Sequence, residues 1–218
     1  KYIFVFFLFL CFFFFLRSKK EETILLKGNQ TEEGFFEHLE QLEKKDKRIQ
    51  KVLNHREEYP IELLEMLSNN IEMLDFVLDY PEKEGNVYAD TVEEAKKGTI
   101  PFLLQWDSRW GYADYGGQAL AISGCGPTAL SMVLIGLTGD SQLTPYKIAK
   151  FSEREGFFYP NTGTSWSLMS EGAEAFGVKS TELSLSKEAI YQSLRNGNPI
   201  ICSMRPGDFT KTGHFIVL

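Results

Sequence analysis

Clustered positive charge is missing from this sequence. The chain of 218 residues carries a formal net charge of −7. Residues 1–100 hold 14 Lys and Arg against 20 Asp and Glu, and residues 101–218 hold 9 against 10. Because binding to a nucleic-acid backbone depends on clustered Lys and Arg, we expect no nucleic-acid partner.

Cysteine is scarce as well. The sequence has three cysteines, Cys11, Cys125 and Cys202, which are too few for a disulfide framework. Cys11 lies inside an apolar run, and a bridge between the other two would block a candidate nucleophile. No cluster of His, Cys and Asp has metal-ligand spacing, and no glycine-rich phosphate loop is present. We therefore expect no metal and no cofactor.

Residues 2–16 form an uninterrupted apolar stretch that is rich in Phe. A membrane span needs about 20 apolar residues, whereas the core of a signal peptide needs roughly 7–15. No cleavage site with small residues follows, which favours an uncleaved anchor. The basic residues Arg17, Lys19 and Lys20 would tend to hold their side in the cytoplasm. Against that tendency, we expect residues 1–20 to be a signal or membrane anchor and the second half of the chain to be extracytoplasmic.

Residues 21–97 are dense in charge and mostly helical in pattern. Phe35, Leu39 and Leu42 lie on one helical face after the candidate N-cap Thr31. Two further short helices are expected over 61–67 and 71–77, with Pro81 ending the second. No catalytic pattern appears, so we interpret residues 21–97 as a helical accessory region.

From residue 98 the composition shifts to Gly, aromatic and small residues. The pattern predicts helices over 124–137 and 165–176, an extended stretch over 178–185, and a third helix between Ser186 and Gly197. Strands are expected over 199–204 and 214–218. This order predicts an α+β domain over 98–218, in which a helical lobe precedes an antiparallel sheet.

Cys125 stands in the most informative segment, Ser-Gly-Cys-Gly-Pro-Thr. The flanking residues Gly124 and Gly126 would let a carbonyl group approach the sulfur. Pro127 suits the first turn of a helix, and the apolar run after it continues that helix into a core. A thiol at a helix N-terminus is expected to have a lowered pKa. The alternative is that Cys125 is a small buried hydrophobic residue, the usual state of a single cysteine.

His214 follows a glycine and begins an apolar strand. A base beside a thiol needs one ring nitrogen facing the sulfur and the other held by a third group. His38 and His55 lie in the charged helical region, which leaves His214 as the candidate base. Its alternative role is that of a strand-edge histidine with satisfied hydrogen bonds.

These motifs resemble those of the cysteine peptidases related to bacteriocin-processing peptidases, the C39-like group found in many bacterial surface proteins. The resemblance covers residues 101–218. It implies a papain-like fold and hydrolysis of a peptide or protein substrate through an acyl-enzyme, with Cys125 as nucleophile and His214 as base. The matching blocks are Pro101–Gly111, Ser123–Leu130, Gly163–Trp166, Asn196–Ile201 and Gly213–Leu218.

Two further site residues stay open. For the oxyanion glutamine of papain-like peptidases the candidate is Gln118, seven residues before Cys125, with Gln105 as the alternative. The family's third residue, an Asp or Asn, follows the histidine strand. We expect the domain to be truncated at Leu218 and this residue to lie beyond it, unless Asp208 substitutes.

Two other functions compete with thiol peptidase activity. One is a papain-fold binding module at the cell surface that has lost catalysis, although the presence of both Cys125 and His214 argues against it. The other is a cell-wall peptide endopeptidase of the NlpC type. Its cysteine is usually followed by Ser-Gly, whereas here Gly-Pro-Thr follows.

Overall fold

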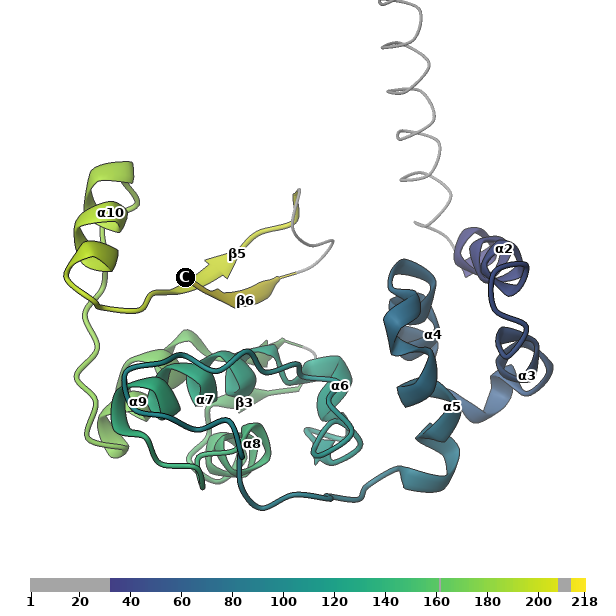
Figure 1. Ribbon diagram of the computed structural model, residues 1–218, viewed down its shortest axis with the longest axis horizontal. Helices are drawn as coiled ribbons and strands as arrows, with labels where there is room; N and C mark the ends of the chain where they lie inside the picture. The colour runs from purple at the N-terminus through teal and green to yellow at the C-terminus, as the bar shows by residue number, and fades with distance from the viewer. Residues whose placement is uncertain (1–31, 161, 208–212) are drawn as a thin grey trace, which may run out of the picture. The chain divides into compact units, whose positions relative to one another are not determined.

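The computed structural model describes residues 32–160, 162–207 and 213–218. The chain divides into two compact units, Lys1–Pro81 and Glu82–Leu218 (Figure 1). The expected anchor at residues 1–20, the N-cap candidate Thr31 and the acid Asp208 lie outside the described residues. In the part of the chain that is described, no helix is both long enough and apolar enough to cross a membrane.

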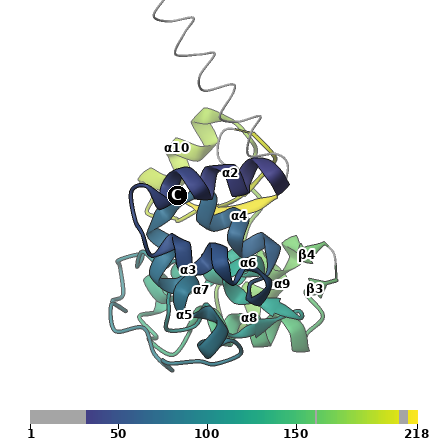
Figure 2. The ribbon, with the colours of Figure 1, turned by 90° about the vertical axis from the view of Figure 1, so that its right-hand side faces the viewer.

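The first unit is a small helical assembly whose core comes from one face of each main helix. Its elements are α2 (Glu32–Glu43), α3 (Ile49–Asn54), η1 (Arg56–Glu58), α4 (Ile61–Asn69), η2 (Ile71–Met73) and α5 (Leu74–Lys83). Figure 2 shows these helices from the side. Helix α2 packs against α3 and α4, and its Phe35, Leu39 and Leu42 are buried, as their helical spacing predicts.

One helix boundary in this unit was predicted wrongly. Pro81 does not end the second short helix, because α5 continues through it to Lys83. Proline keeps a helical φ, and both the lost N–H bond and the clash of its ring with the carbonyl four residues earlier fall in the last turns of α5, which ends at Lys83. Helix α3 was not predicted, since its six residues are too short to establish a periodicity.

In its described residues, the second unit is α+β, with helices and three two-stranded antiparallel sheets. Its helices are α6 (Leu120–Ser123), α7 (Cys125–Thr138), α8 (Pro145–Arg154), η3 (Trp166–Met169), α9 (Glu171–Ala175) and α10 (Lys187–Arg195). Its strands are β1 (Asp114–Tyr115), β2 (Gln118–Ala119), β3 (Phe158–Tyr159), β4 (Gly163–Thr164), β5 (Ile201–Met204) and β6 (His214–Val217).

Helix α7 is the central element of this unit and confirms the helix expected over 124–137. It packs against α8 and β6, and most of its residues from Gly126 to Gly136 are buried. Gly139 ends the helix with φ 81°, a left-handed conformation that glycine adopts without a steric penalty. The buried helix therefore holds its first residue, Cys125, in a fixed position.

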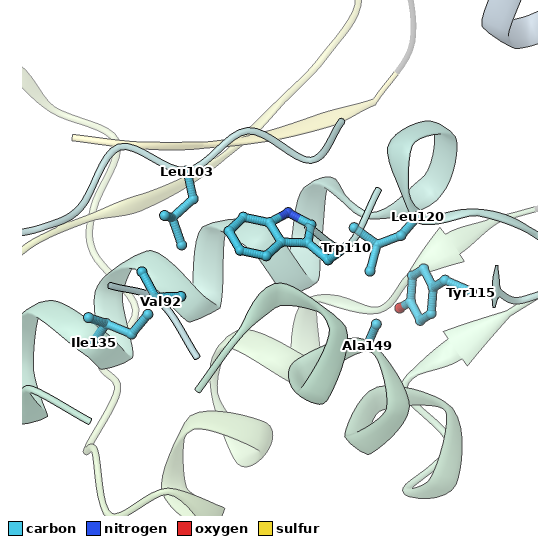
Figure 3. Packing of buried hydrophobic residues seen from close by; sticks show 7 residues of the cluster. All are labelled: Val92, Leu103, Trp110, Tyr115, Leu120, Ile135 and Ala149. Atoms are coloured by element: carbon cyan, nitrogen blue, oxygen red, sulfur yellow. The ribbon is translucent and has the colours of Figure 1, made fainter. Parts of the chain in front are cut away.

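Trp110 lies at the centre of the main core cluster of this unit, between Leu103 and Leu120 (Figure 3). Its ring is fully buried, and its indole Nε1 donates to the carbonyl of Leu104 at 2.9 Å. Val92 belongs to the same cluster. Composition had grouped residues 82–97 with the helical region. In the structure these residues belong to the second unit.

The elements between α7 and the last sheet differ in part from the expectation. The single helix expected over 165–176 is wrong, because Ser170 (φ −106°, ψ −80°) separates η3 from α9. Helix α10 is confirmed, and its N-cap Ser186 accepts from the N–H of Ala189 at 3.1 Å. No strand is assigned over 178–185, all of which the structure describes.

The last sheet pairs β5 with β6 in antiparallel register, which confirms the two expected strands. Met204 lies opposite His214, and Ser203 lies opposite Phe215. Beyond the strand ends, Ile200 and Leu218 exchange both backbone hydrogen bonds, at 3.0 and 2.9 Å. Because hydrogen-bonded and non-hydrogen-bonded pairs alternate, Ser203 and Phe215 form a non-hydrogen-bonded pair. The N–H of Phe215 therefore points away from β5, toward the outer edge of β6.

Candidate active site

Cys125 is the first residue of α7 and follows directly on the short helix α6. Gly124 separates the two helices, and its N–H donates to the carbonyl of Leu120 at 2.7 Å. Pro127 lies in the first turn, where backbone N–H groups have no acceptor within the helix, so the N–H that proline lacks is not needed there. The sequence therefore places this thiol at a helix start, as predicted.

The two flanking glycines are required by close packing. A Cβ atom on Gly124 would lie 2.4 Å from the carbonyl oxygen of Leu120. A Cβ atom on Gly126 would lie 2.8 Å from the Thr164 side chain of β4. The sequence argument had explained these glycines by substrate access alone. The structure adds that they let α6 and β4 approach the nucleophile candidate closely.

Three backbone N–H groups stabilise the thiolate form of Cys125. They belong to Cys125 itself, to Gly126 and to Phe215 of β6, and each lowers the pKa of the thiol. Burial has a larger and opposite effect, so the pKa of Cys125 lies above its usual value. The expected low pKa is therefore corrected: the donors of the helix start are present, but desolvation outweighs them.

His214 is the first residue of β6 and precedes the residue whose N–H reaches the sulfur. Its side chain is partly buried, and this burial lowers the pKa of the imidazole below its usual value. Among the described residues, no hydrogen bond joins the His214 ring to Cys125. The β6 backbone beside His214 is thus close to the thiol, and the lowered pKa keeps the imidazole of His214 neutral.

The lowered pKa of His214 predicts a pH dependence of stability. As the pH falls below about 6.5, the unfolded chain takes up a proton at this residue before the folded chain does. The contribution of His214 to stability is therefore complete above that pH and is lost as the pH falls toward the lowered pKa. We expect the urea midpoint to drop more between pH 7.5 and 5.5 in the wild type than in His214→Gln. Equal drops would contradict burial of this imidazole.

The two candidate glutamines lie in different surroundings. Gln118 is exposed on β2, opposite Tyr115 in a two-stranded hairpin. Gln105 is partly buried, and its side-chain Nε2 donates to the carbonyl of Ala121 at 2.5 Å and more weakly to that of Ile122 at 3.4 Å. Gln105 is therefore tied to the segment that leads into Cys125, although 20 residues of sequence separate the two.

A metal site has little support in the described residues. One group there, His55, Glu57 and Glu58 of the first unit, has ligand atoms within 4.8 Å of one another. All three side chains are exposed, and Nδ1 of His55 lies 3.5 Å from a carboxylate oxygen of Glu58. This cluster is explained as a solvated surface group.

Several residues near the thiol were not singled out from the sequence as site residues. Tyr115 is fully buried and close enough to Cys125 for a charge on the thiol to raise the phenol pKa. Thr164 contacts Gly126, as described above. Trp166, two residues further on, is 72% exposed, in contrast to the buried Trp110. The Tyr-Gly-Gly turn around Tyr115 was the signal available in the sequence.

A model of the family described as Peptidase_C39 like matches residues 98–218. The matched range begins where the composition changes, and it contains both Cys125 and His214. No curated protein and no solved structure matches this chain.

Proposed function

This chain belongs to the Peptidase_C39 like family, and from that premise we propose that it is a cysteine peptidase with Cys125 as its nucleophile. The observation that carries this proposal is the meeting of two distant segments at one sulfur atom. The helix start supplies the N–H groups of Cys125 and Gly126, and the strand that begins with His214 supplies that of Phe215. Family membership supports peptidase chemistry, and this geometry supports the choice of thiol.

The proposed reaction begins with proton transfer from the thiol to the neutral ring of His214. The thiolate then attacks the substrate carbonyl carbon, and the tetrahedral intermediate collapses as the imidazolium protonates the leaving amine. Water, activated by the same imidazole, hydrolyses the acyl-enzyme and regenerates the thiol. Burial raises the pKa of the thiol and lowers that of the imidazole, so the resting proton is on sulfur. Contacts made when the substrate binds must therefore favour the ion pair.

The oxyanion of the intermediate needs preorganised donors. The N–H of Cys125 is one, since it lies in the first turn of α7 without a helical acceptor. Gln105 is favoured over Gln118 as the second donor, because its amide nitrogen is held against the segment that leads into Cys125, whereas the Gln118 side chain is exposed on the hairpin. We therefore propose Gln105, the alternative of the two, for this role.

Gln105→Ala should reduce kcat by roughly 10²–10³-fold, the usual effect of removing one oxyanion donor. Gln118→Ala is the matched control and should keep nearly full activity, because its side chain is exposed on the hairpin. Steady-state kinetics on one fluorogenic peptide measures both. A larger loss for Gln118→Ala than for Gln105→Ala would return the role to Gln118.

The competing function is a papain-fold binding module without catalysis. The raised pKa of the Cys125 thiol is the observation that favours it. Incubation of the protein with a mixture of unmodified peptides, followed by mass spectrometry of the products, separates the two functions. We expect new peptide termini that disappear after treatment with iodoacetamide. Retention of intact peptides on the protein, with no cleavage, would favour the binding module.

A further inference from the structure

Tyr115 connects three elements around the thiol through its hydroxyl group and its backbone. Its phenol oxygen lies 2.8 Å from Oγ1 of Thr164 in β4 and 2.9 Å from Oγ of Ser152 in α8. Its backbone carbonyl accepts from Oγ of Ser123 in α6 at 3.0 Å. The ring is fully buried and packs edge-on against Phe158, with ring centroids 4.8 Å apart. These contacts hold the Tyr115 side chain in one position.

Two of these partners flank the nucleophile candidate. Ser123 stands two residues before Cys125, and its hydroxyl anchors the end of α6. Thr164 presses on Gly126, where even a methyl group would lie 2.8 Å from its side chain. Because the N–H of Gly126 lowers the pKa of the thiol, a displacement of Thr164 would give this donor room to move.

We propose that Tyr115 is a positioning residue that holds Ser123–Gly126 from both sides and keeps the N–H groups of the helix start aimed at the thiol. This inference rests on the proposed function, since it concerns the reactivity of Cys125. Tyr115 reaches the thiol through Ser123 and Thr164, and it takes no part in bond making. Its loss should therefore change how readily the thiolate forms.

The titratable side chains near Tyr115 and Cys125 decide which protonation steps can appear in the pH profile of Cys125 reactivity. Burial raises the pKa of the Tyr115 phenol, with smaller contributions from the negative charges of Glu153 and Cys125, so the phenol stays neutral. Glu153 of α8 pairs with Lys150 at 2.7 Å, and Lys150 also reaches Asp114 of β1 at 3.5 Å. From the last sheet, His214 and Cys202 are the titratable side chains. Tyr115→Phe removes a neutral hydroxyl group and leaves the charges of all these groups in place.

The test is the rate of Cys125 alkylation by iodoacetamide as a function of pH, followed by mass spectrometry on the full chain. In Tyr115→Phe we expect the rate at pH 7 to fall roughly three- to tenfold and the midpoint of the profile to rise by about half to one pH unit, the effect of weakening one hydrogen bond to the thiolate. Thr164→Val keeps the shape that contacts Gly126 but loses the hydroxyl. It should reproduce Tyr115→Phe, and the double variant should add nothing further.

Ser152→Ala is the control for a purely structural role. It breaks a hydrogen bond of the same phenol group and should lower the melting temperature, but it leaves Thr164 in place and should keep the wild-type profile. A wild-type profile in Tyr115→Phe, or an equal shift in Ser152→Ala, would overturn the proposal. These outcomes are separate from a failure of the peptidase function, which would appear as intact peptides with a Cys125 profile that still depends on Tyr115.

Discussion

Replacing Cys125 by serine should reduce peptide hydrolysis to the background rate, a loss of roughly four orders of magnitude or more. Serine has nearly the same size, so the close contacts of Gly124 and Gly126 with their neighbours are preserved. Its hydroxyl ionises far less readily than a thiol, and the His214 ring makes no hydrogen bond to Cys125 within the described residues that would activate it. The fold should therefore survive while the chemistry stops.

Cys202→Ala is the matched control for this loss. Cys202 lies in β5, opposite Ile216, and only burial shifts the pKa of its thiol. It has no share in the donors that surround Cys125, so its replacement should leave hydrolysis within about twofold of the wild type, the range of an ordinary non-site substitution. Hydrolysis that survives in Cys125→Ser but disappears in Cys202→Ala would exchange the roles of the two thiols.

Replacing His214 by alanine should lower kcat by about 10²–10⁴-fold, the usual contribution of a general base. With no base next to the sulfur, the buried thiol keeps its proton, because its pKa is raised. Added imidazole should restore part of the activity in His214→Ala, since the small base can occupy the space of the missing ring. Kinetics with and without imidazole measures the effect.

His55→Gln is the control for this variant. His55 belongs to the first unit, where its side chain is exposed. Its loss should leave kcat unchanged. A wild-type kcat in His214→Ala would show that His214 is not the base and that the thiolate forms by another route.

Part of the site could be predicted because local sequence determines it. The Gly-Cys-Gly-Pro segment followed by an apolar run specifies a helix that begins at Cys125, and α7 begins there. The strands that carry Cys202 and His214 were likewise readable from their β-branched and aromatic residues. In each case one short segment contained the whole signal.

Helix α8 was missed although its signals are present. Thr144 accepts from the N–H of Lys147 at 3.2 Å and Pro145 is the first helical residue, which is a regular helix start. The helix also buries one regular face, Pro145, Ile148, Ala149 and Ser152, so its helical periodicity could have been read from the sequence. Its contact with Tyr115 through Ser152 joins residues 37 apart in the sequence, which a linear pattern cannot connect.

The rest of the site depends on tertiary packing that sequence spacing does not record. The choice between Gln105 and Gln118 illustrates this, because the residue nearer in sequence to Cys125 lies on an exposed hairpin. The outward N–H of Phe215 depends on the register of β5 and β6, which a shift of one residue would reverse. The thiol pKa likewise depends on burial, which opposes the effect of the helix start.

The most direct measurement is brief labelling of the wild-type chain with iodoacetamide at pH 7.5, with the label located by mass spectrometry while peptide hydrolysis is followed in the same sample. The account predicts that Cys125 is labelled ahead of Cys202, because the N–H groups of Cys125, Gly126 and Phe215 offset part of the effect of burial on its thiol, whereas burial alone shifts the pKa of Cys202. It also predicts that hydrolysis falls in proportion to the labelled fraction of Cys125. Preferential labelling of Cys202, or full hydrolysis after complete labelling of Cys125, would contradict the assignment of the nucleophile.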